Sequence, residues 1–167
     1  QQGGTQTWDL KVKPRGKFRR QVCDFPPLKL NFSKTALFNR GLADHDKLKL
    51  VTHCTEDKNV GNENVMQEYL AYKLYQALNP YSFRVQLVSI QYIDASGRLN
   101  GIRRLGFLIE DTSELEARIS GKECDDCTYQ PITAFDTKVS GMHAMFQYLI
   151  GNADYSVPVL RNIKLIR

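Results

Sequence analysis

The stretch DKLKLVTHC, residues 46–54, carries the pattern that decides the fold class of this chain. Its apolar and polar residues alternate with a period of two, as they do in a β-strand that buries one face. Leu48 and Leu50 are expected on one face of this strand. Lys47 and Lys49 are expected on the other face, so the strand would present both lysines on one side of a sheet.

A helix is predicted directly after this strand, over residues 62–78. Asn62 is a residue type that caps helix N-termini, and Asn79 followed by Pro80 ends the helical pattern. The apolar residues have three-to-four spacing, and we expect a buried stripe of Met66, Leu70, Leu74 and either Ala77 or Leu78. Glu68 occupies a neighbouring face of the same helix.

Strands are predicted on both sides of this strand and helix. They cover TWDLKV (7–12), PPLKLNF (26–32), SFRVQLVSIQYID (82–94), RRLGFLIED (103–111) and RNIKLI (161–166). The pair at 82–94 and 103–111 is joined by a Gly-containing turn and predicts an antiparallel hairpin.

Two further helices are predicted in the last third of the chain. TSELEARI (112–119) begins with Thr and Ser followed by Glu, which is a helix-start pattern. GMHAMFQYLIGN (141–152) has an apolar face of Met142, Met145, Phe146 and Leu149, which we expect to be buried. Gly151 can adopt the left-handed conformation that closes a helix, so Asp154 would lie in the loop directly after it.

The composition is that of an ordinary globular protein, with 42% hydrophobic and 25% charged residues. The 167 residues suffice for one domain, or for two small lobes. No apolar run is long enough to span a membrane. The first residues, Gln1, Gln2, Gly3 and Gly4, have no charged or apolar region of a signal peptide, so none is expected in the chain as given. We interpret these residues as the trimmed end of an exported precursor, which favours a secreted or cell-envelope location.

The cysteines leave several alternatives open. Cys23, Cys54, Cys124 and Cys127 allow three disulfide pairings. Alternatively CDDC (124–127) with His53 and Cys54 has ligand types suited to zinc, or the thiols are free. No HExxH motif or Ser-His-Asp spacing is present, which argues against a protease or hydrolase.

A basic run, KVKPRGKFRR (11–20), holds much of the net charge of +5. Its alternating start suits the wet face of an edge strand. It also suits phosphate or nucleic-acid binding, but only Trp8 and Phe18 flank it, and nucleic-acid proteins usually place more aromatic side chains among such charges. We therefore consider nucleic acid an unlikely partner.

The order of the parts indicates a fold class. A strand with Lys, a helix with Glu, a hairpin, helices, and then a loop with Asp and a downstream Asn follow one another as in a protein-kinase-like fold. This is an α+β fold, with an antiparallel-sheet N-lobe and one main helix over residues 1–111. Residues 112–167 would form the beginning of a helical C-lobe with a candidate catalytic loop.

Several segments resemble the spore-coat CotH kinase family, an atypical kinase group. They are LKLNF, DKLKLVTHCTED, QEYLAYKLYQAL, SFRVQLVSIQYID, GFLIED and the terminal IGNAD, and the similarity covers residues 26–118 and 143–166. The resemblance implies transfer of the γ-phosphoryl group of ATP to a protein hydroxyl with Mg²⁺ or Mn²⁺, often by exported proteins.

The resemblance also implies roles for residues of this chain. Lys49, with Lys47 as its competitor, would bind the nucleotide, and Glu68 would be the helix carboxylate. The hinge that holds adenine would fall at residues 109–111, which include Glu110. Asp154 would be the catalytic carboxylate, and Asn162 would bind the metal.

The chain departs from the kinase pattern in three places. Asp154 and Asn162 are farther apart than the roughly four intervening residues of a kinase loop. No Gly-rich loop precedes Lys49, although PRGKFRR is a basic substitute for one. No DFG-type Asp follows before Arg167, so two hypotheses remain: an incomplete atypical kinase, or a non-catalytic, pseudokinase-type binding module.

Overall fold

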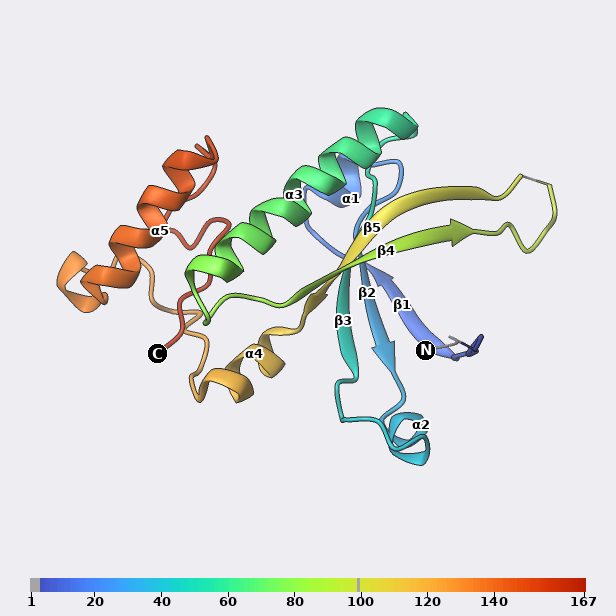
Figure 1. Ribbon diagram of the computed structural model, residues 1–167, viewed down its shortest axis with the longest axis horizontal. Coiled ribbons are helices and arrows are strands. Elements are labelled where there is room, and N and C mark those ends of the chain that lie inside the picture. The colour runs from blue at the N-terminus through green and yellow to red at the C-terminus, as the bar shows by residue number, and fades with distance from the viewer. Residues whose placement is uncertain (1–3, 99) are drawn as a thin grey trace. The chain divides into compact units, whose positions relative to one another are not determined.

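Five antiparallel strands form one sheet in the computed structural model, which describes residues 4–98 and 100–167 (Figure 1). The strands are β1 (Leu10–Pro14), β2 (Leu28–Phe32), β3 (Lys47–Val51), β4 (Val85–Tyr92) and β5 (Ile102–Glu110). Their order across the sheet is β1-β2-β3-β5-β4, and each neighbouring pair is antiparallel. With the helices, this sheet makes the chain a mixed α+β protein.

The helices lie between and after the strands. They are α1 (Arg19–Val22), α2 (Lys34–Asn39), α3 (Lys58–Leu78), α4 (Thr112–Ile119), the short 3₁₀ helix η1 (Ile132–Ala134) and α5 (Thr137–Leu149). The helix expected over 112–119 is confirmed by α4. Helices α3 and α5 both begin earlier than the sequence pattern predicts.

Most strands lie where the alternation predicts them. β2 and β3 fall within 26–32 and 46–54, and β4 and β5 form the expected hairpin. The strand expected over residues 161–166 is wrong, because these described residues form only isolated bridges. Asn162 has a left-handed φ of 54°, which interrupts the extended conformation of a strand.

The chain divides into two compact units. The first comprises residues 1–70 and 84–111, and the second comprises residues 71–83 and 112–167, so α3 contributes to both. The N-terminal residues 1–3, interpreted above as part of a trimmed end, lie outside the described residues, as does Leu99 of the predicted turn.

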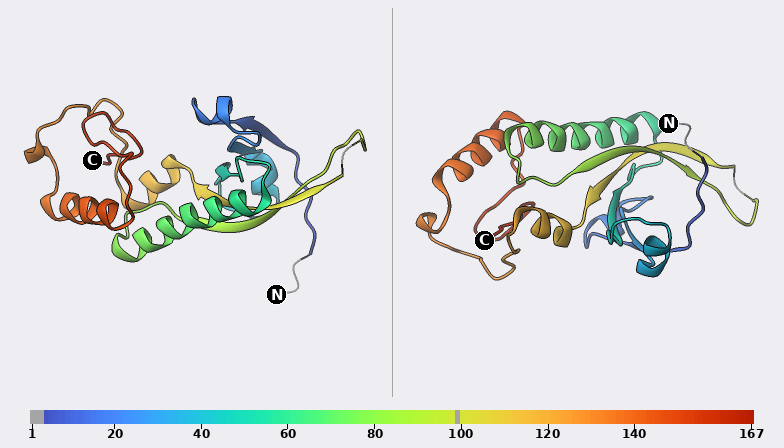
Figure 2. Two further views of the ribbon diagram at one scale, coloured as in Figure 1. Left: turned by 90° about the horizontal axis from the view of Figure 1, so that it is seen from above. Right: turned by 60° about the horizontal axis from the view of Figure 1, so that its bottom comes forward.

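In the first unit, α3 runs alongside the β4–β5 hairpin (Figures 1 and 2). Tyr69 packs on Phe107 of β5, with 5.9 Å between ring centroids, and Phe107 is fully buried. The buried residues of α3 are Gly61 and Val65. Gly61 lacks a side chain and that of Val65 is small, so the helix can lie close to its neighbours here.

The apolar stripe predicted for α3 is not its buried side. Leu70, Leu74 and Leu78 are 49%, 55% and 51% exposed. The three-to-four spacing identified the helix correctly, but it did not identify the buried face, which carries smaller residues. The packed face of α3 lies about one residue earlier around the helix, at Gly61 and Val65.

The cap of α3 also differs from the prediction. Asp57 Oδ1 accepts hydrogen bonds from the N–H groups of Asn59 and Val60, each at 2.9 Å. Asn62 lies inside the helix, and its Oδ1 accepts the N–H of Leu105 in β5 at 2.9 Å. Asn62 therefore joins the helix to the hairpin rather than starting the helix.

We predict that Gly61→Ala destabilises the protein although Ala is the better helix former. A Cβ atom at Gly61 would lie 2.9 Å from the backbone oxygen of His53, so the expected loss is about 1–3 kcal/mol of unfolding free energy. Gly141→Ala in α5 is the matched control, since its Cβ meets nothing within 4 Å. The control should stabilise by roughly 0.5–1 kcal/mol in urea unfolding, and a stabilising Gly61→Ala would contradict the packing.

His53 is the most deeply buried titratable side chain of the first unit's core, at 1% exposure. Its ring lies between Phe25 and Tyr92, with centroids at 4.2 and 5.5 Å. Neither ring nitrogen has a hydrogen-bond partner among the described residues. Burial, aided by the charge of Arg104, lowers the pKa of His53 below its ordinary 6.5, which favours the neutral form of the ring in the folded protein.

The buried His53 should make the fold sensitive to acid. Because its folded pKa is lowered, the unfolded chain binds the extra proton more readily once the pH falls below 6.5. We expect the unfolding free energy to be largest above that pH and to decline below it. Urea unfolding at several pH values should show a flatter decline for His53→Leu, and equal slopes for both proteins would contradict this prediction.

In the second unit, α5 begins after Asp136, whose Oδ1 accepts the N–H of Val139 at 2.8 Å. Phe146 is the buried apolar residue of this helix, and it packs on Tyr75 with 4.9 Å between centroids. His143 lies on the same side, with Nδ1 3.1 Å from the Tyr75 hydroxyl. Burial lowers the pKa of His143.

The predicted buried face of α5 is wrong in part. Met145 and Leu149 are 71% and 76% exposed, whereas Phe146 is buried as expected. Gly151 has a φ of 64°, which confirms the left-handed position predicted after the helix. The end of the chain then returns to the segment after α4 (Figure 2), where Lys122 and Arg167 exchange backbone hydrogen bonds.

Candidate functional site

Five lysines share one face of β1, β2 and β3. Residues that lie directly opposite each other in antiparallel strands point to the same face, and the register pairs Lys13 with Lys29 and Lys29 with Lys49. In the next row, Lys11 and Lys47 flank Asn31 on either side. We call Lys11, Lys13, Lys29, Lys47 and Lys49 the lysine face.

The lysine face continues into the apolar surface under α3. Lys49 lies opposite Ile109 of β5, and Ile109 lies opposite Val85 of β4. Ile109 is 4% exposed, and its neighbour on the same face is the fully buried Phe107. This sheet face is therefore basic on three strands and apolar where β5 and β4 adjoin Lys49, so Lys49 is at the boundary.

Asp111 adds a carboxylate beside the lysine face. It follows β5 two residues after Ile109, so it continues on the same face, and it is 8% exposed. Its Oδ2 lies 3.8 Å from Nζ of Lys29. From the sequence, Asp111 was expected only in a hinge, and Lys29 was not expected in the site. The alternation of residues 26–32 already put Lys29 between two leucines, but its alignment with Lys49 depends on strand register.

Glu68 lies in α3, which follows β3 directly as predicted. Its Oε2 accepts hydrogen bonds from Nη1 and Nη2 of Arg19, both at 3.4 Å, and the two side chains are partly exposed. Arg19 belongs to α1 in the basic segment between β1 and β2. The structure thus brings the predicted carboxylate to the predicted basic loop, while an approach of Glu68 to Lys49 stays a prediction.

Glu110 has a structural contact that the sequence did not reveal. It lies opposite Leu48, hence on the face away from Lys49, and is 8% exposed. Its Oε2 accepts the N–H of Arg84 at 2.9 Å, and its own N–H donates to the carbonyl of Arg84 at 3.0 Å. The side chain of Glu110 therefore fixes the start of β4, and any contact with a nucleotide stays a prediction.

We predict that Glu110→Ala lowers the unfolding free energy by about 1–3 kcal/mol, because it leaves the Arg84 N–H without its acceptor. Glu110→Gln keeps an acceptor oxygen and should lose less. Thermal and urea unfolding of both variants measure this difference. Equal stabilities for Glu110→Ala and the parent protein would contradict the structural role.

Asp154 and Asn162 are brought together by the loop after α5, although they are eight positions apart. Nδ2 of Asn162 donates to the backbone oxygen of Asp154 at 2.6 Å and to its Oδ2 at 3.0 Å. Their separation in the sequence is longer than in a kinase loop. The gap is absorbed by a closed turn in which Ser156 and Arg161 exchange two backbone hydrogen bonds.

The local backbone explains how the turn closes. Leu160 and Asn162 both adopt left-handed φ values, of 52° and 54°. Asn tolerates this conformation better than most residues, which suits its place here. Asn152 Oδ1 accepts the N–H of Asp154 at 3.0 Å and anchors the other end of the loop.

The Asp154 carboxylate is open to solvent, with 74% of its side chain exposed. Nη1 of Arg161 lies 3.7 Å from Oδ1. The Asp154 carboxylate and the Asn162 amide oxygen are hard oxygen donors, which suit Mg²⁺ or Mn²⁺ completed by water or phosphate oxygens. The donor set therefore fits the metals implied by the resemblance.

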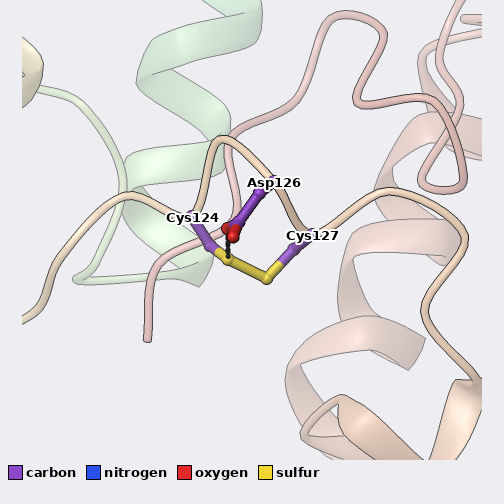
Figure 3. Close-up of side chains that lie close together, drawn as sticks. All are labelled: Cys124, Asp126 and Cys127. Carbon is purple, nitrogen blue, oxygen red and sulfur yellow. Dashed lines mark hydrogen bonds between the residues drawn. A yellow bond between two sulfur atoms is a disulfide. The ribbon is translucent and has the colours of Figure 1, made fainter.

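The cysteines form two disulfides, Cys23–Cys54 and Cys124–Cys127. Figure 3 shows the second one, with Oδ1 of Asp126 3.1 Å from Sγ of Cys124. Cysteines joined in a disulfide offer no thiolate to a metal, so these groups do not form the zinc site that the sequence left open. The first disulfide ties the segment after α1 to the end of β3.

No protein-family model, curated protein or solved structure matches this chain in the three comparisons made. Among the described residues, no helix is both long and apolar enough to cross a membrane.

Proposed function

We propose that this chain is a phosphotransferase domain of protein-kinase-like fold, similar to the CotH spore-coat kinases. It would transfer the γ-phosphoryl group of ATP to a hydroxyl group of a protein substrate. Lys49, with Lys47 beside it, would contact the phosphates, and the 109–111 segment would hold adenine. The two disulfides support a secreted or cell-envelope location, because disulfides persist in oxidising compartments.

The observation that carries this proposal is the hydrogen bond between Asp154 and Asn162. A kinase catalytic loop needs a carboxylate for the attacking hydroxyl and an amide for the metal, close together. The distance of 3.0 Å between Asn162 Nδ2 and Asp154 Oδ2 supports such an arrangement in spite of the longer loop. A lysine on the third strand and a glutamate on the following helix also match the parts of a kinase nucleotide site.

Each residue has a defined chemical task in the proposed reaction. Asp154 orients the substrate hydroxyl and accepts its proton as the new O–P bond forms and ADP departs. Lys49 stabilises negative charge on the phosphate oxygens. Mg²⁺ or Mn²⁺, held by Asn162, would neutralise further phosphate charge when bound. Arg19, oriented by Glu68, supplies charge from the loop that replaces a Gly-rich loop.

We predict that Asp154→Asn separates binding from chemistry. Transfer of labelled γ-phosphate to protein should fall about 10²–10⁴-fold, as expected for loss of a general base. The thermal shift produced by ATP with Mn²⁺ should be largely kept. Lys49→Met should instead reduce the thermal shift. Asp125→Asn, an exposed carboxylate in the same unit, is the matched control and should change neither quantity.

The opposite results have a clear meaning. If the parent protein shows neither a thermal shift with ATP and Mn²⁺ nor phosphate transfer, the phosphotransferase proposal fails and the binding-module alternative gains. Transfer that survives Asp154→Asn would remove Asp154 from the chemistry.

A further inference from the structure

The lysine face is more basic than a single nucleotide-binding lysine requires. We propose that it binds a chain of phosphate groups, with Lys29 and Lys13 contacting phosphate oxygens beside Lys49. This inference rests on the proposed function, because ATP supplies such a chain in its triphosphate. It adds two residues, on β1 and β2, to the phosphate contacts.

The strand register places these three lysines in one row. Lys13 lies opposite Lys29, and Lys29 lies opposite Lys49, across three neighbouring strands. Neighbouring strands are about 4.8 Å apart, and each lysine has a flexible four-carbon stem with three N–H donors. The three ammonium groups can therefore converge on one extended anion that lies across the strands.

Lysines that lie directly opposite each other in this row repel one another. Like charges directly opposite each other in a sheet destabilise it. Protection of an edge strand explains lysines on β1, which is at the edge, but β2 and β3 are interior strands. The leucines of β2 and β3, among them Leu30 and Leu48, occupy the other face, so the lysines are concentrated on one side.

Asp111 lies beside Lys29 in this row. The 3.8 Å between Asp111 Oδ2 and Lys29 Nζ is longer than a direct hydrogen bond, so the ammonium group retains donors for a ligand. Asp111 is 8% exposed and Lys29 has 45% of its side chain exposed. The Asp111 carboxylate is therefore buried next to Lys29, while the Lys29 ammonium group can reach solvent.

The composition of the face favours a compact phosphate chain over nucleic acid. Single-stranded nucleic acids bind where aromatic rings stack on bases beside the charges. The two rows on β1, β2 and β3 hold lysines and Asn31. Trp8, which flanks the basic run, already packs on Phe32 at 5.6 Å and under Arg40 at 3.9 Å.

The test is equilibrium binding of inorganic tripolyphosphate, ATP, adenosine and a short single-stranded oligonucleotide to the full chain, at two salt concentrations. The variants are Lys29→Met and Lys13→Met. Lys34→Met is the charge-matched control, because Lys34 lies in α2 outside the strands and pairs with Asp44 at 2.9 Å. Circular dichroism confirms that each variant is folded.

We expect Lys29→Met to weaken tripolyphosphate and ATP about tenfold and Lys13→Met to weaken them less, with Lys34→Met unchanged. Unchanged tripolyphosphate binding in Lys29→Met would overturn the inference. So would an oligonucleotide that binds more tightly than tripolyphosphate at equal phosphate concentration, since it would favour nucleic acid.

The same data separate this inference from the proposed function. If tripolyphosphate binding depends on Lys29 but no γ-phosphate is transferred, the phosphate site stands and the phosphotransferase proposal falls. If ATP binds and transfers phosphate equally well in Lys29→Met, the phosphotransferase proposal stands and the phosphate site falls.

Discussion

The antiparallel register of the five strands is the constraint on which the rest of the first unit depends. Because opposed residues share a face, the pairing of Lys29 with Lys49 and of Lys49 with Ile109 settles where the charges lie. A slip of one residue would move every lysine to the other face and every apolar partner with it. The burial of Phe107 under α3 makes such a slip costly, since the ring is fully buried.

Much of this half of the molecule could be predicted from the sequence. The period of two in residues 46–54 and 82–111 identified β3 and the β4–β5 hairpin, and the three-to-four spacing identified α3. The strand partners could not be predicted, because register depends on contacts between distant segments. The lysine row and the ion pair of Lys29 with Asp111 were therefore missed.

The errors have physical causes as well. The three-to-four spacing of Leu70, Leu74 and Leu78 predicts that they are buried, but they are exposed. The buried residues of α3 are instead Gly61 and Val65, whose small size lets the helix pack close to its neighbours. The alternation in residues 161–166 resembles a strand, but a left-handed Asn162 turns the chain. That same turn brings Asn162 to Asp154. For this reason the sequence pattern predicted a strand that does not form, and the residue spacing did not predict that the two side chains meet.

We propose that the lysine face is a phosphate-binding surface centred on Lys29 and Lys49. The most direct measurement is NMR of the lysine side-chain ε-methylene and ammonium signals during titration with tripolyphosphate. We expect the signals of Lys29 and Lys49 to shift together and saturate, while that of Lys34 in α2 does not follow them. Equal, unsaturated shifts of all lysines would show nonspecific ion attraction and would contradict a phosphate site on the lysine face.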